Sequence, residues 1–335
     1  MGQELIPSFR SFTETIFEAL GCDASDKFYF FHSSGEAIQQ LFLFHYFDHV
    51  RSCGRNHILT TNIEEASVLM ALHRLEELQC HGKMLPINEQ GQLTSAALEK
   101  AINPRTSLLS VSWANGLTGV IHPIADIAEM CRAKDIRLHV DASYVIGKLY
   151  FRFEDLPIDY LTFDGSFLHA PKGTAGLLVK SKSPFSSPMG SSVGGMAALS
   201  QALEENMHMF DHVCLETARL RAKFESKIQQ QIPDAQVFFQ KADRLPNCCA
   251  IAFPGVFSDA LLFLLNRKGV YASLGGGHCQ KLSHILIASG IEETLANCAL
   301  SFSLSFETRE EEIDYAIRVI VESVQKLKAL SGQLL

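Results

Sequence analysis

The run His139-Val140-Asp141-Ala142 closes an apolar segment with the character of a β-strand. An aspartate at the carboxyl end of a strand can face a ligand that is bound above the sheet. A buried carboxylate in such a place can hold a ring nitrogen protonated, which makes pyridoxal phosphate an electron sink. The same aspartate could instead cap the turn that follows the strand. The motif alone leaves both interpretations open.

A second candidate for chemistry is Cys279, which follows three glycines (Gly275–Gly277) and His278. A protonated histidine beside a cysteine favours the thiolate, and a glycine-rich loop allows the cysteine to move. We therefore expect Cys279 to be the most reactive of the nine cysteines. The alternative is a loop cysteine without a role.

The remaining cysteines indicate neither a disulfide framework nor a zinc site. Their total of nine is odd, no C-x-x-C pair occurs, and Cys248-Cys249 is the one close pair. The pattern is typical of reduced thiols in a cytoplasmic protein. His278-x-Cys alone does not provide a metal site, so no metal is expected.

Short apolar strands alternate with helical stretches over the first half of the chain. The expected strands cover residues 28–31, 57–60, 107–112, 136–140, 160–163 and 176–179, and the expected helices cover 9–20, 36–47, 63–78, 95–101 and 124–133. This alternation predicts an α/β fold with a mostly parallel sheet wrapped by helices. Chemistry in such sheets lies at the carboxyl ends of the strands. The loops of interest therefore begin at His32, Thr61, Trp113, Asp141 and Asp164.

The segment Ser183–Gly195, rich in Ser, Gly and Pro, marks a domain boundary. We expect a large domain over residues 1–195, with its core at about 20–195, and a small α+β domain over 196–335. The small domain should contain helices at 196–231, 258–268 and 309–327, with strands near 249–253 and 299–305. A length of 335 residues suits two such domains.

Composition excludes several classes of function. The net charge is −8 and no Lys/Arg-rich block occurs, which argues against a nucleic-acid partner. The longest apolar runs are far too short to span a membrane, and the N-terminus lacks the pattern of a secretory signal.

Over about 300 residues the sequence resembles the class V aminotransferase family, and within it the NifS-type cysteine desulfurases. Three family motifs occur in order, as Asn115–Gly119, His139–Ala142 and Gly147–Leu149. Three further segments match: Tyr160–Val179, the loop with Cys279, and Phe302–Ile320. The resemblance implies the two-domain fold of type I pyridoxal-phosphate enzymes, a homodimer, and pyridoxal phosphate as cofactor.

The resemblance fails at the positions that would hold this cofactor. Phe167 stands where the family has its Schiff-base lysine, and a phenyl ring cannot form an imine. The phosphate position, which we define as Ser34–Glu36 with Asp164 and Ser166, carries two carboxylates, Glu36 and Asp164. They would repel a dianionic phosphate. Weak binding of pyridoxal phosphate at best is therefore expected.

Further family positions are altered and others are kept. Glu65 replaces the ring-stacking histidine, Ser301 replaces the arginine that clamps the substrate carboxylate, and the segment Pro188–Ser192 is shortened. The family's N-terminal strand and loop, with a substrate-facing asparagine, are also expected to be missing. The cofactor-binding candidates are Asp141, Tyr144, Asn115, Gly35 and Ser166. Tyr144 could still donate a hydrogen bond, and Asn115 lies one place before the contacting position, Gly116. Trp113 could stack on a ligand or fill the altered pocket.

Three hypotheses follow for the function. The first is a degenerate homologue that binds or regulates a desulfurase or a sulfur-acceptor protein. The second is an active enzyme that uses Lys172, five residues after Phe167, or binds pyridoxal phosphate without a covalent bond. The third is a carrier that accepts persulfide on Cys279.

Overall fold

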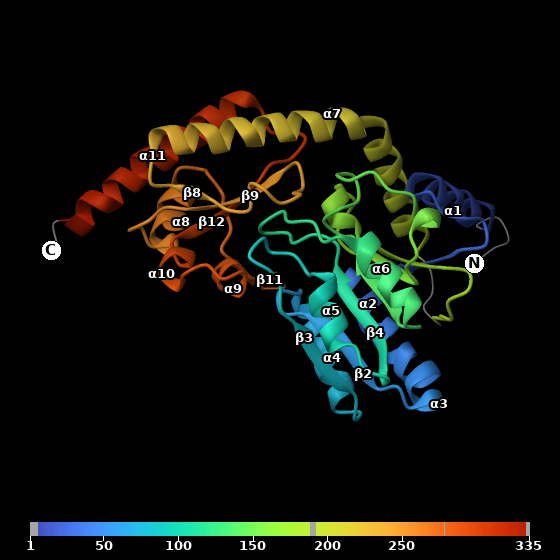
Figure 1. Cartoon of the computed structure of the whole chain (residues 1–335). Helices are drawn as coiled ribbons and strands as arrows, with labels where there is room; N and C mark the ends of the chain where they lie inside the picture. Colours follow the sequence, from blue (N-terminus) through green and yellow to red (C-terminus); the bar gives the residue numbers. More distant parts are fainter. Residues whose placement is uncertain (1–5, 188–191, 278, 333–335) are drawn as a thin grey trace. The chain divides into compact units, whose positions relative to one another are not determined.

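The computed structural model describes residues 6–187, 192–277 and 279–332 (Figure 1). The chain forms two compact units. The first unit contains the residues up to 86, 93–113 and 122–210, and the second contains 87–92, 114–121 and 211 onwards. Each unit is made of three separate segments of the chain. The expected division into a large domain over residues 1–195 and a small domain over residues 196–335 stays a prediction.

The first unit is built on a seven-stranded sheet of order β1-β7-β6-β5-β4-β2-β3. Its strands are β1 (Lys27–Phe31), β2 (His57–Thr61), β3 (His81–Leu85), β4 (Thr106–Ser112), β5 (Arg137–Asp141), β6 (Tyr160–Asp164) and β7 (Ala175–Val179). β2–β3, β2–β4, β4–β5 and β5–β6 are parallel, whereas β7 is antiparallel to both β1 and β6. The mostly parallel sheet is thereby confirmed. Six strands point the same way, and their carboxyl ends share one edge.

Helices cover this sheet (Figure 1). Those that contact the strands are α2 (Ser34–His45), α4 (Ala66–Glu76), α5 (Ser95–Ala101) and α6 (Ile124–Ala133). The unit also contains α1 (Ile6–Leu20), α3 (Arg51–Cys53), a π-helical turn at Tyr46–Val50 and 3₁₀ turns at Phe153–Asp155 and Gly165–Leu168. Ile38 and Phe42 of α2 are buried with Leu72 of α4 against Ile58 and Leu108 of the sheet. Because α2 follows β1 directly, its first turn lies at the carboxyl edge.

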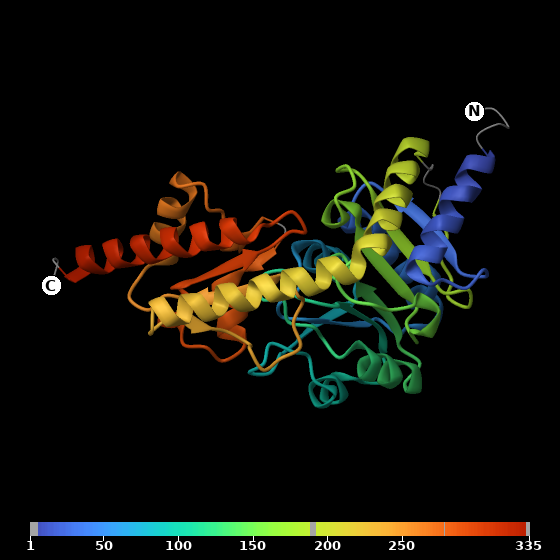
Figure 2. The same cartoon turned by 90° about the horizontal axis from the view of Figure 1, so that it is seen from above.

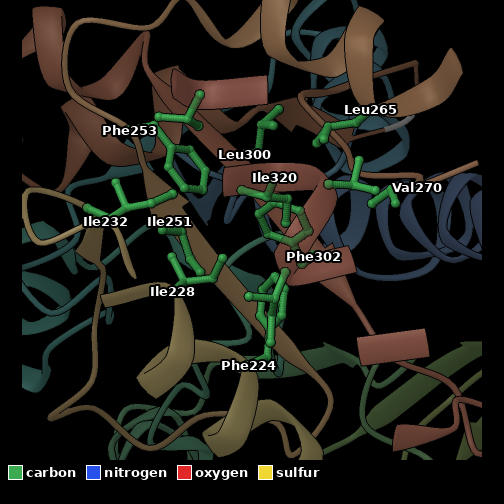
Figure 3. Packing of buried hydrophobic residues seen from close by; sticks show 14 of the residues in the cluster. Phe224, Ile228, Ile232, Ile251, Phe253, Leu265, Val270, Leu300, Phe302 and Ile320 are labelled. Carbon is green, nitrogen blue, oxygen red and sulfur yellow. The ribbon is translucent and has the colours of Figure 1, made fainter. Parts of the chain in front are cut away.

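The second unit has a small sheet and its own core. The long helix α7 (Val193–Gln231) contributes its second half to it, followed by β8 (Gln236–Val237), β9 (Cys248–Ala252), α8 (Ser258–Arg267), β10 (Gly275–Gly276), β11 (Cys279–Lys281), α9 (Leu282–Ala288), α10 (Glu293–Ala296), β12 (Ala299–Ser303) and α11 (Glu310–Gly332). β12, β9 and β8 form an antiparallel sheet, along which α11 runs (Figure 2). Phe224 and Ile228 of α7 pack with Ile251, Phe302 and Ile320 in this core (Figure 3).

The expected elements differ from the structure mainly at the sheet edges and in the small unit. Helices α5 and α6 have the expected bounds, whereas β3, β8, α9 and α10 were not expected. The β3 sequence HGKML is mostly exposed, so it lacks the alternation that marks a half-buried strand. The glycine loop before Cys279 forms the short hairpin β10–β11.

Candidate functional site

The carboxyl edge of the large sheet gathers the loops that the sequence singled out. Asp141, at the end of β5, is 7% exposed. Its Oδ1 accepts hydrogen bonds from the Ser143 amide (3.0 Å) and the Ser143 hydroxyl (2.6 Å). Burial raises the pKa of Asp141 to about 6, against the partial opposing effect of these bonds. Asp141 therefore caps its own turn, and its contact with a ring nitrogen stays a prediction.

Glu64, in the loop after β2, is a second buried carboxylate at this edge and was missed by the sequence reasoning. It is 1% exposed. It accepts hydrogen bonds from the Thr61 hydroxyl (2.8 Å), the Ser112 hydroxyl (2.6 Å) and the Ser112 amide (3.1 Å). Burial, together with the charge of Asp141, raises its pKa to about 7 despite these bonds. Glu64 thus joins the ends of β2 and β4.

We expect Glu64→Gln to alter how stability depends on pH. Between pH 4.5 and 7 folded Glu64 holds a proton that the unfolded chain releases, so its contribution to stability falls as pH rises. The glutamine removes this fall. Relative to wild type, the variant should therefore gain about 3 kcal/mol of unfolding free energy between pH 4.5 and 8.

Urea unfolding at several pH values measures this gain. Glu89→Gln, which removes an exposed carboxylate, is the matched control. Equal profiles for Glu64→Gln and wild type would contradict the role assigned to Glu64.

Asp164, at the end of β6, connects three elements. Its Oδ1 accepts from the Ser166 amide (2.9 Å) and hydroxyl (2.6 Å), which caps the turn Gly165–Leu168. Its Oδ2 accepts from the Ser34 amide at the start of α2 (3.4 Å). Its own amide donates to the Ser143 hydroxyl (3.1 Å). The carboxylate therefore already lies at the amino end of α2.

Glu36 has a different role in the same helix turn. Its Oε2 accepts from the His32 amide (3.0 Å), while its amide donates to the hydroxyl of Ser33, the N-cap residue. This exchange resembles a capping box. Gly35, the residue before Glu36, has little space around it, since a Cβ there would lie 3.3 Å from the Cβ of Ser67.

Phe167 places its ring beside Tyr144. The ring centroids are 4.5 Å apart and inclined by 51°. Its carbonyl oxygen accepts from Lys148 Nζ (3.4 Å). Trp113 is 6% exposed and packs on Phe151, with the ring centroids 5.0 Å apart. This contact favours the interpretation that Trp113 fills the altered pocket over the one in which it stacks on a ligand.

Lys172 lies in the turn before β7, and its side chain is exposed. The neighbouring Gly173 carbonyl is 3.3 Å from His32 Nδ1. Lys172 thus belongs to a surface turn, five residues after Phe167 and directly after Pro171.

The residues present do not fit the phosphate of pyridoxal phosphate. A phosphate at the first turn of α2 would meet the Asp164 carboxylate, which already accepts the Ser34 amide. Two like charges 4 Å apart repel by about 4 kcal/mol near a protein surface. Phe167 supplies no amine. No step involving the cofactor is therefore derived for this chain.

Asn115 lies in the second unit and shapes its own loop. Its Oδ1 accepts from the Leu117 amide (3.1 Å), the Thr118 amide (3.0 Å) and the Thr118 hydroxyl (3.1 Å). Gly119 completes the turn with a φ of +75°. The carboxamide oxygen of Asn115 is therefore engaged within the loop.

A buried ion pair supports the other side of this loop. Val120 forms a β-bridge with Arg244. The Arg244 guanidinium contacts Glu225 of α7 through two bonds, Nη1–Oε1 at 2.8 Å and Nη2–Oε2 at 3.2 Å. Both side chains are at most 8% exposed. The loop is thus held to α7 by a desolvated charge pair that no local sequence pattern reveals.

Ser301 and Cys279 also belong to the second unit. Ser301, 3% exposed, donates its hydroxyl to the Leu117 carbonyl (2.7 Å) and so has a structural contact in this chain. The Cys279 backbone begins β11, opposite Gly276. Gly275 must be glycine, since a Cβ would lie 2.1 Å from the Gln280 carbonyl oxygen. The Cys279 side chain, His278 and residues 188–191 lie outside the described part of the chain.

A cleft of about 660 Å³ lies at the amino ends of β5 and β6, the opposite edge of the sheet. Two carboxylates of this cleft, Asp26 and Asp159, have partners within the chain. Asp26 accepts from the Ser181 amide (3.0 Å), and its Oδ2 lies 4.0 Å from Lys180 Nζ. Asp159 accepts from the Leu138 amide (2.9 Å). The candidate site therefore remains the carboxyl edge. Among the helices of residues 6–187, 192–277 and 279–332, none has the length and apolar character of a membrane span.

Comparisons with known proteins agree with this geometry. The family model described as aminotransferase class-V matches residues 1–196 and 186–316. A cysteine desulfurase of Nostoc sp. strain PCC 7120 is 32% identical over 292 residues, covering 83% of this chain and 73% of the relative. The cysteine desulfurase of Klebsiella pneumoniae is 30% identical with the same coverage.

Solved structures give the same result for the fold. A NifS-like protein has a TM-score of 0.87 at 25% identity, covering 96% of this chain and 88% of its own. A NifS-like protein from Rickettsia africae has a TM-score of 0.81 at 19% identity, with 97% and 89% covered, and supports the fold alone. The predicted type I transferase fold is thereby confirmed. The chain belongs to the class V aminotransferase family, in its cysteine desulfurase (NifS-type) branch.

Proposed function

We propose that the chain is a cysteine desulfurase-like protein without Schiff-base chemistry, which acts by binding or regulating a desulfurase or a sulfur-acceptor protein. The observation that carries this proposal is Phe167, which stands at the predicted lysine position and packs against Tyr144. The family implies pyridoxal phosphate, but at the predicted phosphate position the Asp164 carboxylate already accepts from the Ser34 amide. A homodimer and a cytoplasmic location, as the resemblance and the cysteine pattern imply, are part of the proposal.

The family relationship supports binding as a retained property. A NifS-like protein matches this fold over 96% of the chain, whereas the resemblance places Phe167 at the expected position of the Schiff-base lysine. Surfaces for recognition depend on the fold, whereas covalent catalysis depends on a few side chains. A protein that keeps its recognition surfaces and loses its catalytic side chains is better suited to regulation than to catalytic turnover.

We expect that borohydride reduction in the presence of pyridoxal phosphate will leave no pyridoxyl group on any position of the site. The reason is that a reducible adduct needs a lysine amine that faces the cofactor. Phe167 cannot supply one, and the neighbouring Lys148 Nζ donates to the Phe167 carbonyl. Peptide mass mapping after reduction, with absorbance spectra before it, measures this. Lys172→Gln is the control, because it separates specific labelling of Lys172 from labelling of surface lysines.

Each other result favours a different function. A stoichiometric pyridoxyl group on Lys172, absent in Lys172→Gln, would overturn the proposal in favour of an active enzyme. A persulfide on Cys279, formed with an active desulfurase and detected by mass spectrometry, would instead favour the carrier.

A further inference from the structure

The amide groups in the first turn of α2 need hydrogen-bond acceptors from outside the helix. The amide groups at the amino end of a helix have no partner within the helix, and the helix dipole favours negative charge there. Phosphate groups commonly fill such positions. In this chain Ser33 accepts from the Glu36 amide, and Asp164 Oδ2 accepts from the Ser34 amide. The anion at this helix end therefore comes from the chain itself.

The Asp164 carboxylate is also fixed in place from behind. The Asp164 amide donates to the Ser143 hydroxyl, which in turn donates to Asp141. Asp164 Oδ1 accepts hydrogen bonds from the Ser166 amide and hydroxyl. The resulting network connects the ends of β5 and β6 with the turn Gly165–Leu168 and the start of α2. The carboxylate is thus part of a continuous structure and not a mobile surface group.

We propose that Asp164 is a built-in anion that takes the place of a phosphate, so that the first turn of α2 is held to β6 without any bound cofactor. This inference goes beyond the proposed function, because it concerns how the fold is held and not whether a lysine reacts. It predicts that phosphate stabilises the wild-type protein only non-specifically, and that loss of Asp164 creates both a stability defect and an additional, specific phosphate response.

Glu36 provides the matched control. Its carboxylate lies in the same helix turn, but it accepts from the His32 amide and not from Ser34. Glu36→Gln removes one negative charge close to Asp164 and keeps an oxygen that can accept the His32 amide. A general effect of charge would therefore appear in both variants, whereas the specific effect belongs to Asp164 alone.

The experiment compares thermal midpoints of wild type, Asp164→Ser, Asp164→Asn and Glu36→Gln, in chloride and in inorganic phosphate of equal ionic strength. Asp164→Ser should lower the midpoint in chloride by roughly 2–8 °C, as expected for loss of a helix cap. Phosphate should restore most of this loss by binding to the folded state. Asp164→Asn, which keeps the shape and loses the charge, should respond in the same direction and serves if the serine variant does not fold in chloride.

The readout is the phosphate response of each variant minus that of wild type, because phosphate also stabilises proteins non-specifically. An equal response in all four proteins would overturn the proposal. So would an Asp164→Ser protein with an unchanged midpoint, or one whose loss phosphate does not restore. Since no reaction is measured, these outcomes are independent of whether Lys172 takes up a pyridoxyl group.

Discussion

Replacing Arg244 with methionine is expected to lower the free energy of unfolding by about 3–5 kcal/mol. The Arg244 side chain is 5% exposed and forms two bonds with Glu225, which is 8% exposed. Without the Arg244 guanidinium, the cation that remains near the Glu225 carboxylate is Arg221, whose Nε lies 3.8 Å from Glu225 Oε1. A buried charge that loses its main partner is much more costly than the pair itself is stabilising.

Urea unfolding, with the midpoint and slope both fitted, measures this loss. Arg309→Met is the matched control, because its 3.4 Å pair with Glu312 is 75% and 53% exposed and should contribute at most about 1 kcal/mol. The double variant Arg244→Met with Glu225→Met should recover a large part of the loss, since no charge then remains unpaired. Equal losses for Arg244→Met and Arg309→Met would contradict the importance of this pair.

The elements with strong local signals were predicted well. α5 and α6 have the expected bounds, since Thr94 caps one helix and Pro123 precedes the other. Five of the six strands that point the same way, all but β3, follow from apolar runs that alternate with helices. β3 was missed because an exposed edge strand carries no alternation. The helix expected to reach Phe47 ends at His45 and passes into a π-helical turn, a change that helical periodicity does not reveal.

The sequence predicts which positions make up the candidate site, but it does not predict their contacts. The resemblance identified Asp164, Ser301 and Asn115 as altered or retained positions. Two of these residues have partners far along the chain: Asp164 accepts from Ser34, and Ser301 donates to Leu117. Glu64 was missed for the same reason, since its partner Ser112 is 48 residues away. Such contacts depend on which strand ends share a sheet edge, and spacing alone does not determine this.

Phe167→Lys alone is expected to leave sulfide release from cysteine at the background of the wild-type protein. A lysine at this position could form an imine in principle, but Asp164 would still hold the Ser34 amide and repel the phosphate. Ser301 is the predicted counterpart of the family's carboxylate-clamping arginine, and its hydroxyl donates to the Leu117 carbonyl. Loss of a bidentate, charge-assisted pair costs about 2–5 kcal/mol, or roughly 30- to 5,000-fold in rate.

The measurement is sulfide formed from cysteine with saturating pyridoxal phosphate, for wild type, Phe167→Lys and Phe167→Lys with Asp164→Ser. Removing the carboxylate frees the amide group at the start of α2 for phosphate, so the double variant should bind pyridoxal phosphate at least about tenfold more tightly than the single one, as an absorbance titration would show. Its sulfide release should nevertheless stay low, because Ser301 offers no cation to the substrate. Sulfide release by Phe167→Lys well above wild type would mean that one lysine suffices, and that neither Asp164 nor Ser301 limits the chemistry of this site.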